Sequence, residues 1–471
     1  MSVHEFRYPG RPSGSPAAAS CFKAYDIRGQ IGNDFNEETA WRIGRAYAKV
    51  MSPGMVVVGR DCRDSSPAMQ EALIEGLLDI GMDVADIGLS GTEEVYFATA
   101  HLGASGGIEV TASHNPIDYN GFKMVGPGSR PLTQEEFDAI KHEFLTDRLE
   151  FRYDLRRGTR SHVSVRKHYA RKVASFVQPD QLRPLKLVVN AGNGVGGQAF
   201  DAILQELQAA GAVLDVHRIQ HDPDGTFPNG IPNPLLPENR AATADAVRET
   251  GADLGIAWDG DFDRCFFFDE TGAFVDGEYL VGLLAAAFLE EAPGERIVHD
   301  PRVLWNTRDI VARFGGEAVV SKTGHAHVKR MMRDAGAIYG GEMSAHHYFA
   351  DFMYCDSGMI PWLKVIERMS TTGQPLSALV GEMQAKFPSS GEINFKIANP
   401  DAAMARVIDA LGAAAVEMDG LDGISMSFPE WRLNLRSSST EPLLRLNIEA
   451  SRSREIVDNR VEMVRALIEN R

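Results

Sequence analysis

The chain has 471 residues, and at roughly 100–200 residues per domain this length indicates three or four domains rather than a single core. Its composition, with 44% hydrophobic and 24% charged residues, is typical of a globular α/β protein and excludes disordered and fibrous chains. A formal net charge of −17 argues against nucleic acids and acidic membranes as general partners, because the field of the chain repels polyanions.

The four cysteines are far apart in the sequence and form no CxxC pair. This spacing indicates neither a disulfide framework nor a zinc ribbon, and a reducing cytoplasm is the expected compartment. Residues 1–20 are rich in Pro, Gly, Ser and Ala but lack the apolar segment of a signal peptide, so we expect a flexible leader. The longest apolar run, 279–289, is about half of the ~20 residues that span a bilayer and predicts a buried helix.

Three consecutive segments repeat the order strand, glycine or polar turn, amphipathic helix, strand, which is typical of α/β units. In the first, a strand at 55–61 leads into a helix that Ser66 can cap and that has Pro67 in its first turn. A further helix is expected from about Glu238 in the second segment. The other stretches with strand character are 83–89, 106–112, 185–190, 212–219, 252–258, 296–300, 318–322 and 336–342.

After about Gly373 the pattern changes to stretches that alternate polar and apolar residues with period two, followed by a last helix from about Ser453. The sequence therefore predicts an α/β protein with three similar mixed α/β domains and a smaller C-terminal α+β domain. The expected domain boundaries after the leader are 21–160, 161–273, 274–383 and 384–471.

The motif "WDGDFDRC" carries the most specific chemistry of the chain. On an extended backbone Asp259, Asp261 and Asp263 would project to one face, where three carboxylates repel each other unless a cation lies among them. Hard oxygen ligands of this kind suit Mg²⁺, so we expect a magnesium site. The competing interpretation is a solvated acidic turn.

Two other readings of the same aspartates make different predictions. An EF-hand loop would have glycine at its sixth position, where Arg264 stands, so this reading is rejected even though Glu270 occupies the twelfth position. A phosphatase similar to haloacid dehalogenases would use Asp259 as nucleophile. It would have Thr or Val where this chain has Asp263, and it stays a weaker alternative.

The stretch "GNGVGG" matches GxGxxG through Gly192, Gly194 and Gly197, with Asp215 about 20 residues further on. A nicotinamide site is one interpretation. The stretch lies in mid-chain, however, and a tight strand-to-helix turn needs glycines for conformational reasons alone, so we favour a structural turn.

Three stretches could supply ligands to a phosphate group. In "LRSSSTEP", Arg436 can bind a phosphate in a bidentate manner while Ser438, Ser439 and Thr440 donate hydrogen bonds to it. In "FKAYDIRG", Tyr25 and Arg28 flank an aspartate, and "VGRDCRDSS" offers Arg60 and Arg63 at the end of a strand. Each stretch alone is also compatible with an ordinary turn, a helix cap or a surface ion pair.

Two further turns combine titratable and hydrogen-bonding groups. Lys322 and His325 lie at a strand-to-helix turn, where a cation and an imidazole could serve proton transfer. Glu342 and Ser344 alternate with Met343 after a strand and could bind hydroxyl groups of a sugar. Plain glycine turns with polar residues are the alternative interpretation of both.

The stretch "TASHNP" places Ser113 and His114 side by side after a strand. The serine alone could be a nucleophile, a helix cap or a turn residue. A hydrolase dyad is disfavoured, because the GxSxG elbow is absent and a working base normally comes from another part of the fold, so the adjacent imidazole need not point at the hydroxyl.

Taken together in this order, "FKAYDIRG", "TASHNP", "DGDFDR", "GEMSAHH" and "RSSSTEP" resemble the α-D-phosphohexomutase family over nearly the whole chain after the leader. The longer strings "KTGHAHVK" and "GEMSAHHYF" are most similar to its bacterial phosphomannomutases. This chain departs from the family at Ala345, where relatives often have Gly, and at Ser439, where they often have Asn or Gly.

The resemblance implies four domains around one central cleft, with one motif loop from each domain. It implies that Ser113 carries a phosphoryl group beside His114 and that an oxygen of phospho-Ser113 joins the three aspartates as a Mg²⁺ ligand. Proton transfer would fall to Arg28, Lys123 or His325, with Lys123 close to the transferred group. The residues expected to bind substrate are Tyr25, Arg264, Lys322, Glu342, Ser344, His346, Arg436, Ser438, Ser439 and Thr440.

The reaction implied by the resemblance interconverts mannose 6-phosphate and mannose 1-phosphate through a hexose 1,6-bisphosphate that turns around in the cleft. The product would supply GDP-mannose synthesis in the cytoplasm. Glucose specificity, dual specificity and a non-catalytic phosphosugar-binding protein are the alternatives. A small phosphosugar is the expected partner, with no obligate protein partner, nucleic acid or membrane.

Overall fold

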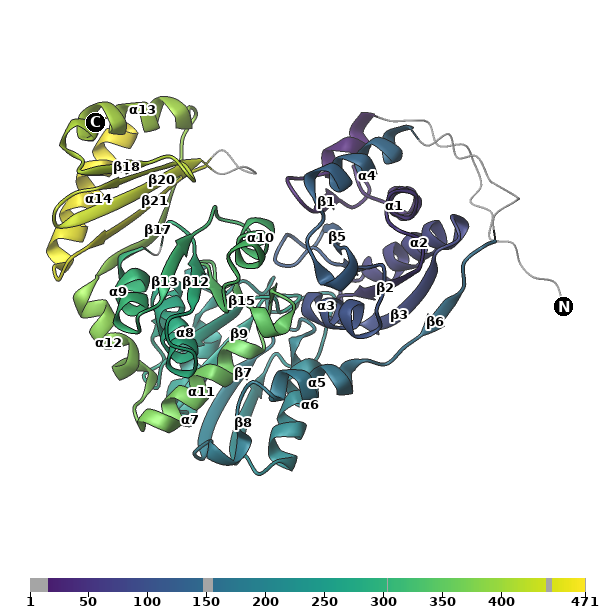
Figure 1. Ribbon diagram of the computed structural model, residues 1–471, viewed down its shortest axis with the longest axis horizontal. Coiled ribbons are helices and arrows are strands. Elements are labelled where there is room, and N and C mark those ends of the chain that lie inside the picture. Colours follow the sequence, from purple (N-terminus) through teal and green to yellow (C-terminus); the bar gives the residue numbers. More distant parts are fainter. Residues whose placement is uncertain (1–15, 147–155, 303, 438–442, 471) are drawn as a thin grey trace. The chain divides into compact units, whose positions relative to one another are not determined.

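The computed structural model describes residues 16–146, 156–302, 304–437 and 443–470 (Figure 1). It separates into two compact units, residues 1–164 and 165–471. The first unit contains one mixed sheet, and the second contains three further sheets in chain order. The α/β fold predicted from the sequence is therefore confirmed, while the central cleft implied by the resemblance stays a prediction.

The first unit is built on a six-stranded sheet with the order β1-β5-β4-β2-β3-β6. Strands β2, β3, β4 and β6 run parallel, whereas β5 is antiparallel to β4 and β1 is antiparallel to β5. The strands are β1 (Ile27–Gln30), β2 (Met55–Arg60), β3 (Asp83–Leu89), β4 (Gly106–Val110), β5 (Tyr119–Val125) and β6 (Arg160–His162). The helices are α1 (Glu37–Val50), α2 (Ser66–Asp79), α3 (Thr92–His101) and α4 (Gln134–Thr146).

The second unit begins with a five-stranded sheet of order β11-β10-β9-β7-β8, in which β7, β8 and β9 are parallel and β10 is antiparallel to β9. Its strands are β7 (Leu185–Asn190), β8 (Leu214–Ile219), β9 (Leu254–Trp258), β10 (Cys265–Phe268) and β11 (Phe274–Val275). Its helices are α5 (Arg166–Ala174), α6 (Gly196–Ala209) and α7 (Ala241–Thr250).

The next sheet has the order β13-β12-β14-β15-β16, again with three parallel strands followed by antiparallel ones. Its strands are β12 (Arg296–His299), β13 (Glu317–Val320), β14 (Tyr339–Gly341), β15 (His347–Phe349) and β16 (Cys355–Asp356). The helices around it are α8 (Gly277–Glu291), α9 (Trp305–Arg313), α10 (His325–Ala335), α11 (Ile360–Thr372) and α12 (Leu376–Lys386). Helix α8 contains the apolar run predicted to be a buried helix, and most of its residues are buried.

The last sheet is antiparallel throughout, with the order β17-β21-β20-β19-β18 (green to yellow in Figure 1). Its strands are β17 (Ser389–Lys396), β18 (Glu417–Asp419), β19 (Ile424–Ser427), β20 (Trp431–Ser437) and β21 (Leu443–Ala450). Helices α13 (Pro400–Leu411) and α14 (Arg454–Glu469) complete an apolar core with it. Helix α14 begins at the position predicted from the sequence, and the Ser453 hydroxyl caps it by accepting from the Ile456 amide.

The first three sheets share one feature that positions the site. In each, a parallel strand is followed by a short loop and then by an antiparallel neighbour: β4 to β5, β9 to β10, and β14 to β15. These loops span 111–118, 259–264 and 342–346, and they contain the serine, aspartate and glutamate motifs. Each loop also has one non-glycine residue at positive φ: Ser113 (48°), Phe262 (47°) and Ala345 (70°). The three motifs therefore occupy equivalent positions in three similar sheets.

Two local predictions differ from the structure. Ser66 does not cap α2, because its hydroxyl donates to Asp61 Oδ1 at 2.5 Å instead of accepting from the helix, and Ser65 at the N-cap position makes no side-chain cap bond either. The helix expected from about Glu238 begins at Ala241, after a 3₁₀ turn that starts with the helix-initiating Pro237.

Helices α1 and α2 pack so closely that glycine is required at their contact. A Cβ atom on Gly76 would lie 2.1 Å from the Trp41 carbonyl oxygen, and one on Gly44 would lie 2.3 Å from the Leu73 carbonyl oxygen. We expect Gly76→Ala to lower the free energy of unfolding by roughly 1–3 kcal/mol, since the helices must separate. Thermal unfolding measures the effect. Gly381→Ala in α12 is the matched control, because a Cβ there meets no described heavy atom within 4 Å. An unchanged melting temperature for Gly76→Ala would contradict the close packing.

Candidate active site

The serine loop that follows β4 is held by one buried arginine. The Arg63 guanidinium donates to the carbonyl oxygens of Ser113 (2.9 Å), Asn115 (2.6 Å) and Pro116 (2.8 Å). Its Nε lies 3.5 Å from Asp61 Oδ2, and its side chain is 1% exposed. Because these bonds occupy donors on both Nη atoms of the guanidinium, Arg63 fixes the loop backbone and is not a phosphate ligand. This differs from one interpretation of "VGRDCRDSS".

Ser113 lies at the turn of this loop with a left-handed backbone and is 3% exposed. Its amide donates to Thr111 Oγ1 at 2.8 Å, and its hydroxyl Oγ lies 3.1 Å from Nδ1 of the exposed His114. The imidazole therefore does contact the serine hydroxyl, although adjacency of the two residues in the sequence does not require this contact. A left-handed conformation is costly for a residue with a Cβ, and such strain is common at functional positions.

Two of the predicted cations belong to the same unit as Ser113. Arg28 on β1 donates to Asp26 Oδ2 at 3.1 Å and reaches Asn115 Oδ1 of the serine loop at 3.4 Å, with Tyr25 half-buried just before this pair. Lys123 is buried on β5, directly opposite Glu109 of β4 in the antiparallel register. The structure thus brings Arg28 to the serine loop and places Lys123 on the strand that follows it.

The aspartate loop gathers three carboxylates in a buried turn. Asp259 and Asp261 are 0% exposed and Asp263 is 2% exposed, and one ligand oxygen of each lies within 4.8 Å of the others. The predicted grouping is therefore present, although its stated reason was wrong. Strand β9 ends at Trp258, and the positive φ of Phe262 turns the chain, so the carboxylates meet across a turn and not along one face of a strand.

Arg264 neutralises part of this acidic group. Its Nε and Nη2 donate to Asp259 Oδ2 at 2.9 and 2.7 Å, and its Nε lies 4.0 Å from Asp263 Oδ1. Burial lowers the pKa of the Arg264 guanidinium, but Asp259 and Asp263 raise it more, so the pKa lies above its ordinary value. Three carboxylates and one guanidinium leave two negative charges in a buried space, which fits a divalent cation with oxygen ligands.

The loop "GNGVGG" supports the aspartate loop and does not resemble a cofactor cradle. The Val195 amide donates to the Gly260 carbonyl at 3.1 Å, and a Cβ on Gly194 would lie 2.6 Å from the same oxygen. Gly192 has φ of 58°, and Asp215 is exposed on β8. These glycines allow close backbone packing, which supports the structural reading over a nicotinamide site.

The glutamate loop that follows β14 fixes Glu342 through three groups. Its Oε2 accepts from the Tyr348 hydroxyl at 2.5 Å, its Oε1 accepts from the Gly324 amide at 2.7 Å, and Arg302 Nη2 lies 3.8 Å from Oε1. Burial raises the pKa of Glu342 above its ordinary value, and the neighbouring charge of Asp300 raises it further. The Gly324 bond also joins this loop to the turn that carries Lys322 and His325.

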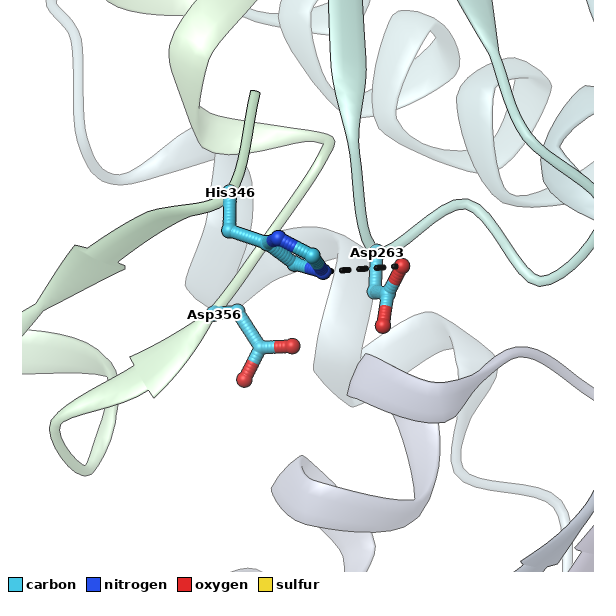
Figure 2. A group of neighbouring side chains, drawn as sticks. All are labelled: Asp263, His346 and Asp356. Carbon is cyan, nitrogen blue, oxygen red and sulfur yellow. Dashed lines mark ion pairs between the residues drawn. The ribbon is translucent and has the colours of Figure 1, made fainter. Parts of the chain in front are cut away.

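His346 links the glutamate loop to the aspartate loop. Its Nε2 lies 3.7 Å from Asp263 Oδ1, and its Nδ1 lies 3.6 Å from Glu342 Oε2 and 3.2 Å from Ser344 Oγ. Figure 2 shows the imidazole pointing toward Asp263, with Asp356 beside this pair. Ligand atoms of Asp263, His346 and Asp356 lie within 4.8 Å of one another, so this second group could also hold a metal.

The two candidate metal groups share Asp263 and differ in charge. In the second group, Lys329 forms a buried ion pair with Asp356, so that carboxylate is already neutralised. The first group, Asp259, Asp261 and Asp263, retains more negative charge and offers only hard oxygen ligands. Mg²⁺ prefers such ligands, and the three aspartates are therefore the better magnesium site.

The remaining predicted residues lie around β13 and β20. Lys322 is exposed after β13 and His325 is the first residue of α10. On β20, Arg436 Nη2 lies 3.2 Å from Glu392 Oε2. Ser438, Ser439 and Thr440 lie outside the described residues.

Several groups of this site were not singled out by sequence reasoning. Arg302 and Asp300 follow β12 in the string "HDPR", and Tyr348 lies on β15. A charged pair at the carboxyl end of a predicted parallel strand was a usable signal for the first two, because ligands gather at that end of a sheet. Tyr348 gave no such signal, since an aromatic residue in a strand usually belongs to the core.

None of the helices among the described residues is both long and apolar enough to cross a membrane.

The chain is similar over most of its length to one family of known proteins. Models of the phosphoglucomutase/phosphomannomutase family match four consecutive segments: α/β/α domain I at 19–150, α/β/α domain II at 167–272, α/β/α domain III at 276–387 and the C-terminal domain at 392–467. These models together span nearly the whole chain.

Individual relatives match over almost their full length. A phosphomannomutase of Salmonella montevideo is 54% identical over 451 residues, covering 95% of this chain and 99% of the relative. Phosphohexose mutases of Xanthomonas campestris are 52% identical over 455 residues, covering 95% of this chain and 98% of the relative. A solved structure of a phosphoglucomutase/phosphomannomutase family protein from Burkholderia thailandensis has a TM-score of 0.84 at 32% identity and covers 96% of this chain and 98% of that one. From its loops and from these matches, the chain belongs to the phosphoglucomutase/phosphomannomutase family.

Proposed function

We propose that this chain interconverts mannose 6-phosphate and mannose 1-phosphate, with a phosphoryl group carried by Ser113 and a hexose 1,6-bisphosphate as intermediate. The observation that carries the proposal is the equivalence of the three hairpin loops. Each presents one kind of group that the reaction needs: a nucleophilic hydroxyl, a carboxylate cluster for a cation, and hydrogen-bonding groups for a sugar. The names of the relatives supply the mannose specificity of the proposal.

In the first transfer, a free hydroxyl oxygen of the bound hexose phosphate attacks the phosphorus of phospho-Ser113. The new sugar O–P bond forms as the Ser113 Oγ–P bond breaks, and the sugar hydroxyl proton passes to a protein base. The second transfer reverses these steps with the other phosphate after the intermediate has turned around. Arg28, Lys123 and His325 are the candidates for proton transfer.

Phosphoryl transfer depends mainly on positioning and on neutralising charge at the transferring oxygens. A Mg²⁺ ion bound by Asp259, Asp261 and Asp263 would supply positive charge to those oxygens. In the second unit Arg264 orients Asp259, and in the first unit Arg63 holds the serine loop by its carbonyl groups. Because Ser113 is buried and its backbone is fixed, its oxygen can be held in line for both transfers.

Sugar recognition falls to Glu342 and Ser344, whose oxygens can bond hydroxyl groups. Tyr348 and the Gly324 amide fix the Glu342 carboxylate before the sugar binds. Arg436, with Ser438, Ser439 and Thr440, would hold the phosphate that is not reacting. Both sets must serve two orientations of the intermediate, so the same groups bind hydroxyls and phosphate in both transfers.

A phosphoglucomutase or a dual-specificity phosphohexomutase is the second candidate, because mannose and glucose differ only at C2. A non-catalytic phosphosugar-binding protein is disfavoured, since this chain keeps the serine and all three aspartates. We further propose a cytoplasmic role in the supply of GDP-mannose.

Steady-state kinetics on both sugars test the substrate assignment. We expect kcat/KM for mannose 1-phosphate to exceed that for glucose 1-phosphate by about tenfold or more, which corresponds to one well-made polar contact at C2. The measurement uses purified protein, Mg²⁺ and a trace of hexose 1,6-bisphosphate as primer. A kcat/KM that is higher for glucose 1-phosphate would contradict mannose specificity while leaving the mutase chemistry in place.

A further inference from the structure

Three arginines converge on one carboxylate in the second unit. The Glu392 Oε2 atom on β17 lies 3.2 Å from Nη1 of Arg302 and 3.2 Å from Nη2 of Arg436, and its Oε1 lies 3.4 Å from Nη1 of Arg445. The carboxylate side chain is 17% exposed, and the three guanidinium side chains are 3%, 12% and 25% exposed. We call Arg302, Arg436, Arg445 and Glu392 the arginine cluster.

The cluster has more positive than negative charge at its outer end. Asp300 already balances Arg302, with Oδ2 2.6 Å from its Nη2. Glu392 is then the carboxylate in direct contact with both Arg436 and Arg445, while Asp422 adds a weaker electrostatic attraction for Arg436. These two arginines are direct cross-strand partners in the β20–β21 ladder. Like charges in that position destabilise a sheet, so their placement calls for an additional anion.

Arg436 also has spare hydrogen-bonding capacity. Its Nε is buried and has no hydrogen-bond partner within the part of the chain that the structure describes. Burial lowers the pKa of its guanidinium, and repulsion from Arg302 and Arg445 lowers it further. A buried guanidinium with an unused donor beside another cation is suited to a dianionic ligand.

Glu392 is kept ionised by the same arginines. Burial would raise the pKa of its carboxyl group, but Arg302, Arg445 and Arg436 hold it below the ordinary value. A permanent carboxylate at the centre of the cluster occupies donors that a phosphate would otherwise use. An internal anion of this kind keeps the guanidinium groups in place when no ligand is bound, at some cost in affinity for the ligand.

We propose that Glu392 is an internal counter-ion for a phosphate clamp formed by Arg436 and Arg445, and that the phosphate of a bound phosphosugar competes with it for these two arginines. The inference rests on the proposed phosphate-binding role of Arg436 and adds Arg445 and Glu392 to that site. Arg302 ties the clamp to sugar recognition, because it lies 3.2 Å from Glu392 and 3.8 Å from Glu342. Glu392 is thus a positioning residue that also limits affinity for phosphate.

The proposal gives opposite signs for two charge-removing variants. Arg445→Gln removes a clamp donor and should weaken the binding of inorganic phosphate about tenfold. Glu392→Gln removes the competing anion and should tighten it about threefold or more, since a negative charge near the ligand is lost. Glu392→Asp keeps the charge and should stay within about twofold of the parent.

Calorimetric titration of inorganic phosphate into the full chain, without divalent metal, measures these constants. All variants keep the serine and aspartate loops, so differences report on the cluster. The control is Arg465→Gln on α14, whose partner Glu462 is exposed and lies 3.5 Å away, and its affinity should equal that of the parent. Binding is read without turnover, so failure of the mutase assignment would not alter these results.

Glu392→Gln could instead bind phosphate more weakly than the parent, with Glu392→Asp restoring the parental value. This result would show that the Glu392 carboxylate only positions the arginines, and it would overturn the counter-ion role. Parental affinity in Arg445→Gln would remove Arg445 from the clamp and overturn the proposal. If Glu392→Gln does not fold, judged by thermal unfolding, the Arg445→Gln result decides. Under the proposal, Arg445→Gln should also raise KM for mannose 1-phosphate more than it lowers kcat.

Discussion

Replacing Ser113 with alanine is expected to lower mutase turnover by at least about 10³-fold, because the oxygen that accepts and returns the phosphoryl group is lost. No neighbouring hydroxyl in the described part of the serine loop shares its position, since Thr111 Oγ1 accepts from the Ser113 amide itself. The measurement is kcat for conversion of mannose 1-phosphate, with protein that has been primed by hexose 1,6-bisphosphate.

The backbone at this position allows a second variant that separates chemistry from folding. Ser113 has φ of 48°, a conformation that costs serine and alanine alike about 1 kcal/mol or more, because both have a Cβ, and costs glycine little. Ser113→Gly should therefore be as inactive as Ser113→Ala while unfolding at no lower temperature than the parent. Ser52→Ala, at an exposed serine of the same unit, is the control and should keep full activity. Substantial turnover by either Ser113 variant would remove the serine from the mechanism.

The second large effect is expected for Asp261→Asn, which should lower kcat at least about 100-fold and weaken the binding of Mg²⁺. Asp261 is fully buried, and its carboxylate lies within 4.8 Å of the ligand oxygens of Asp259 and Asp263. Removing its charge halves the excess of two negative charges in this buried turn. Titration of Mg²⁺ in the kinetic assay measures the affinity.

Asp245→Asn is the matched control for the aspartate loop, because this carboxylate lies on the exposed surface of α7 and forms a local ion pair with Arg248. It should leave both kcat and the Mg²⁺ requirement unchanged. We expect excess Mg²⁺ to restore part of the activity of Asp261→Asn. Full activity of Asp261→Asn in the presence of a chelator would rule out this magnesium site.

Much of the fold follows from patterns that are local in the sequence. Apolar runs, turns and helix starts predicted the three α/β units, and period-two alternation predicted the strands of the C-terminal α+β domain, which form an antiparallel sheet. The antiparallel hairpin in each of the first three sheets was not predicted. The direction of a strand relative to its neighbour is not visible in its sequence, and a three-residue strand such as β15 has no periodicity that distinguishes it from a loop.

The grouping of the three aspartates was predicted, but the reason for it was not. The aspartates were expected on one face of a strand, but they meet because Phe262 takes a left-handed conformation, which the identity of the residue does not reveal. Contacts between segments far apart in the chain could not be read at all. Arg63 reaching the carbonyl groups of the serine loop and Glu392 reaching Arg302 are examples, since each depends on the tertiary fold.

The central claim is that Ser113 carries the phosphoryl group during turnover, and intact-protein mass spectrometry with peptide mapping tests it most directly. The protein is incubated with Mg²⁺ and hexose 1,6-bisphosphate, then quenched and compared with Ser113→Gly treated in the same way. We predict one added phosphate on the peptide that contains "TASHNP". This phosphate should be lost when excess mannose 1-phosphate accepts the phosphoryl group and forms the bisphosphate. It should be absent from the variant. An active enzyme that acquires no phosphate, or acquires it on another residue, would contradict the account.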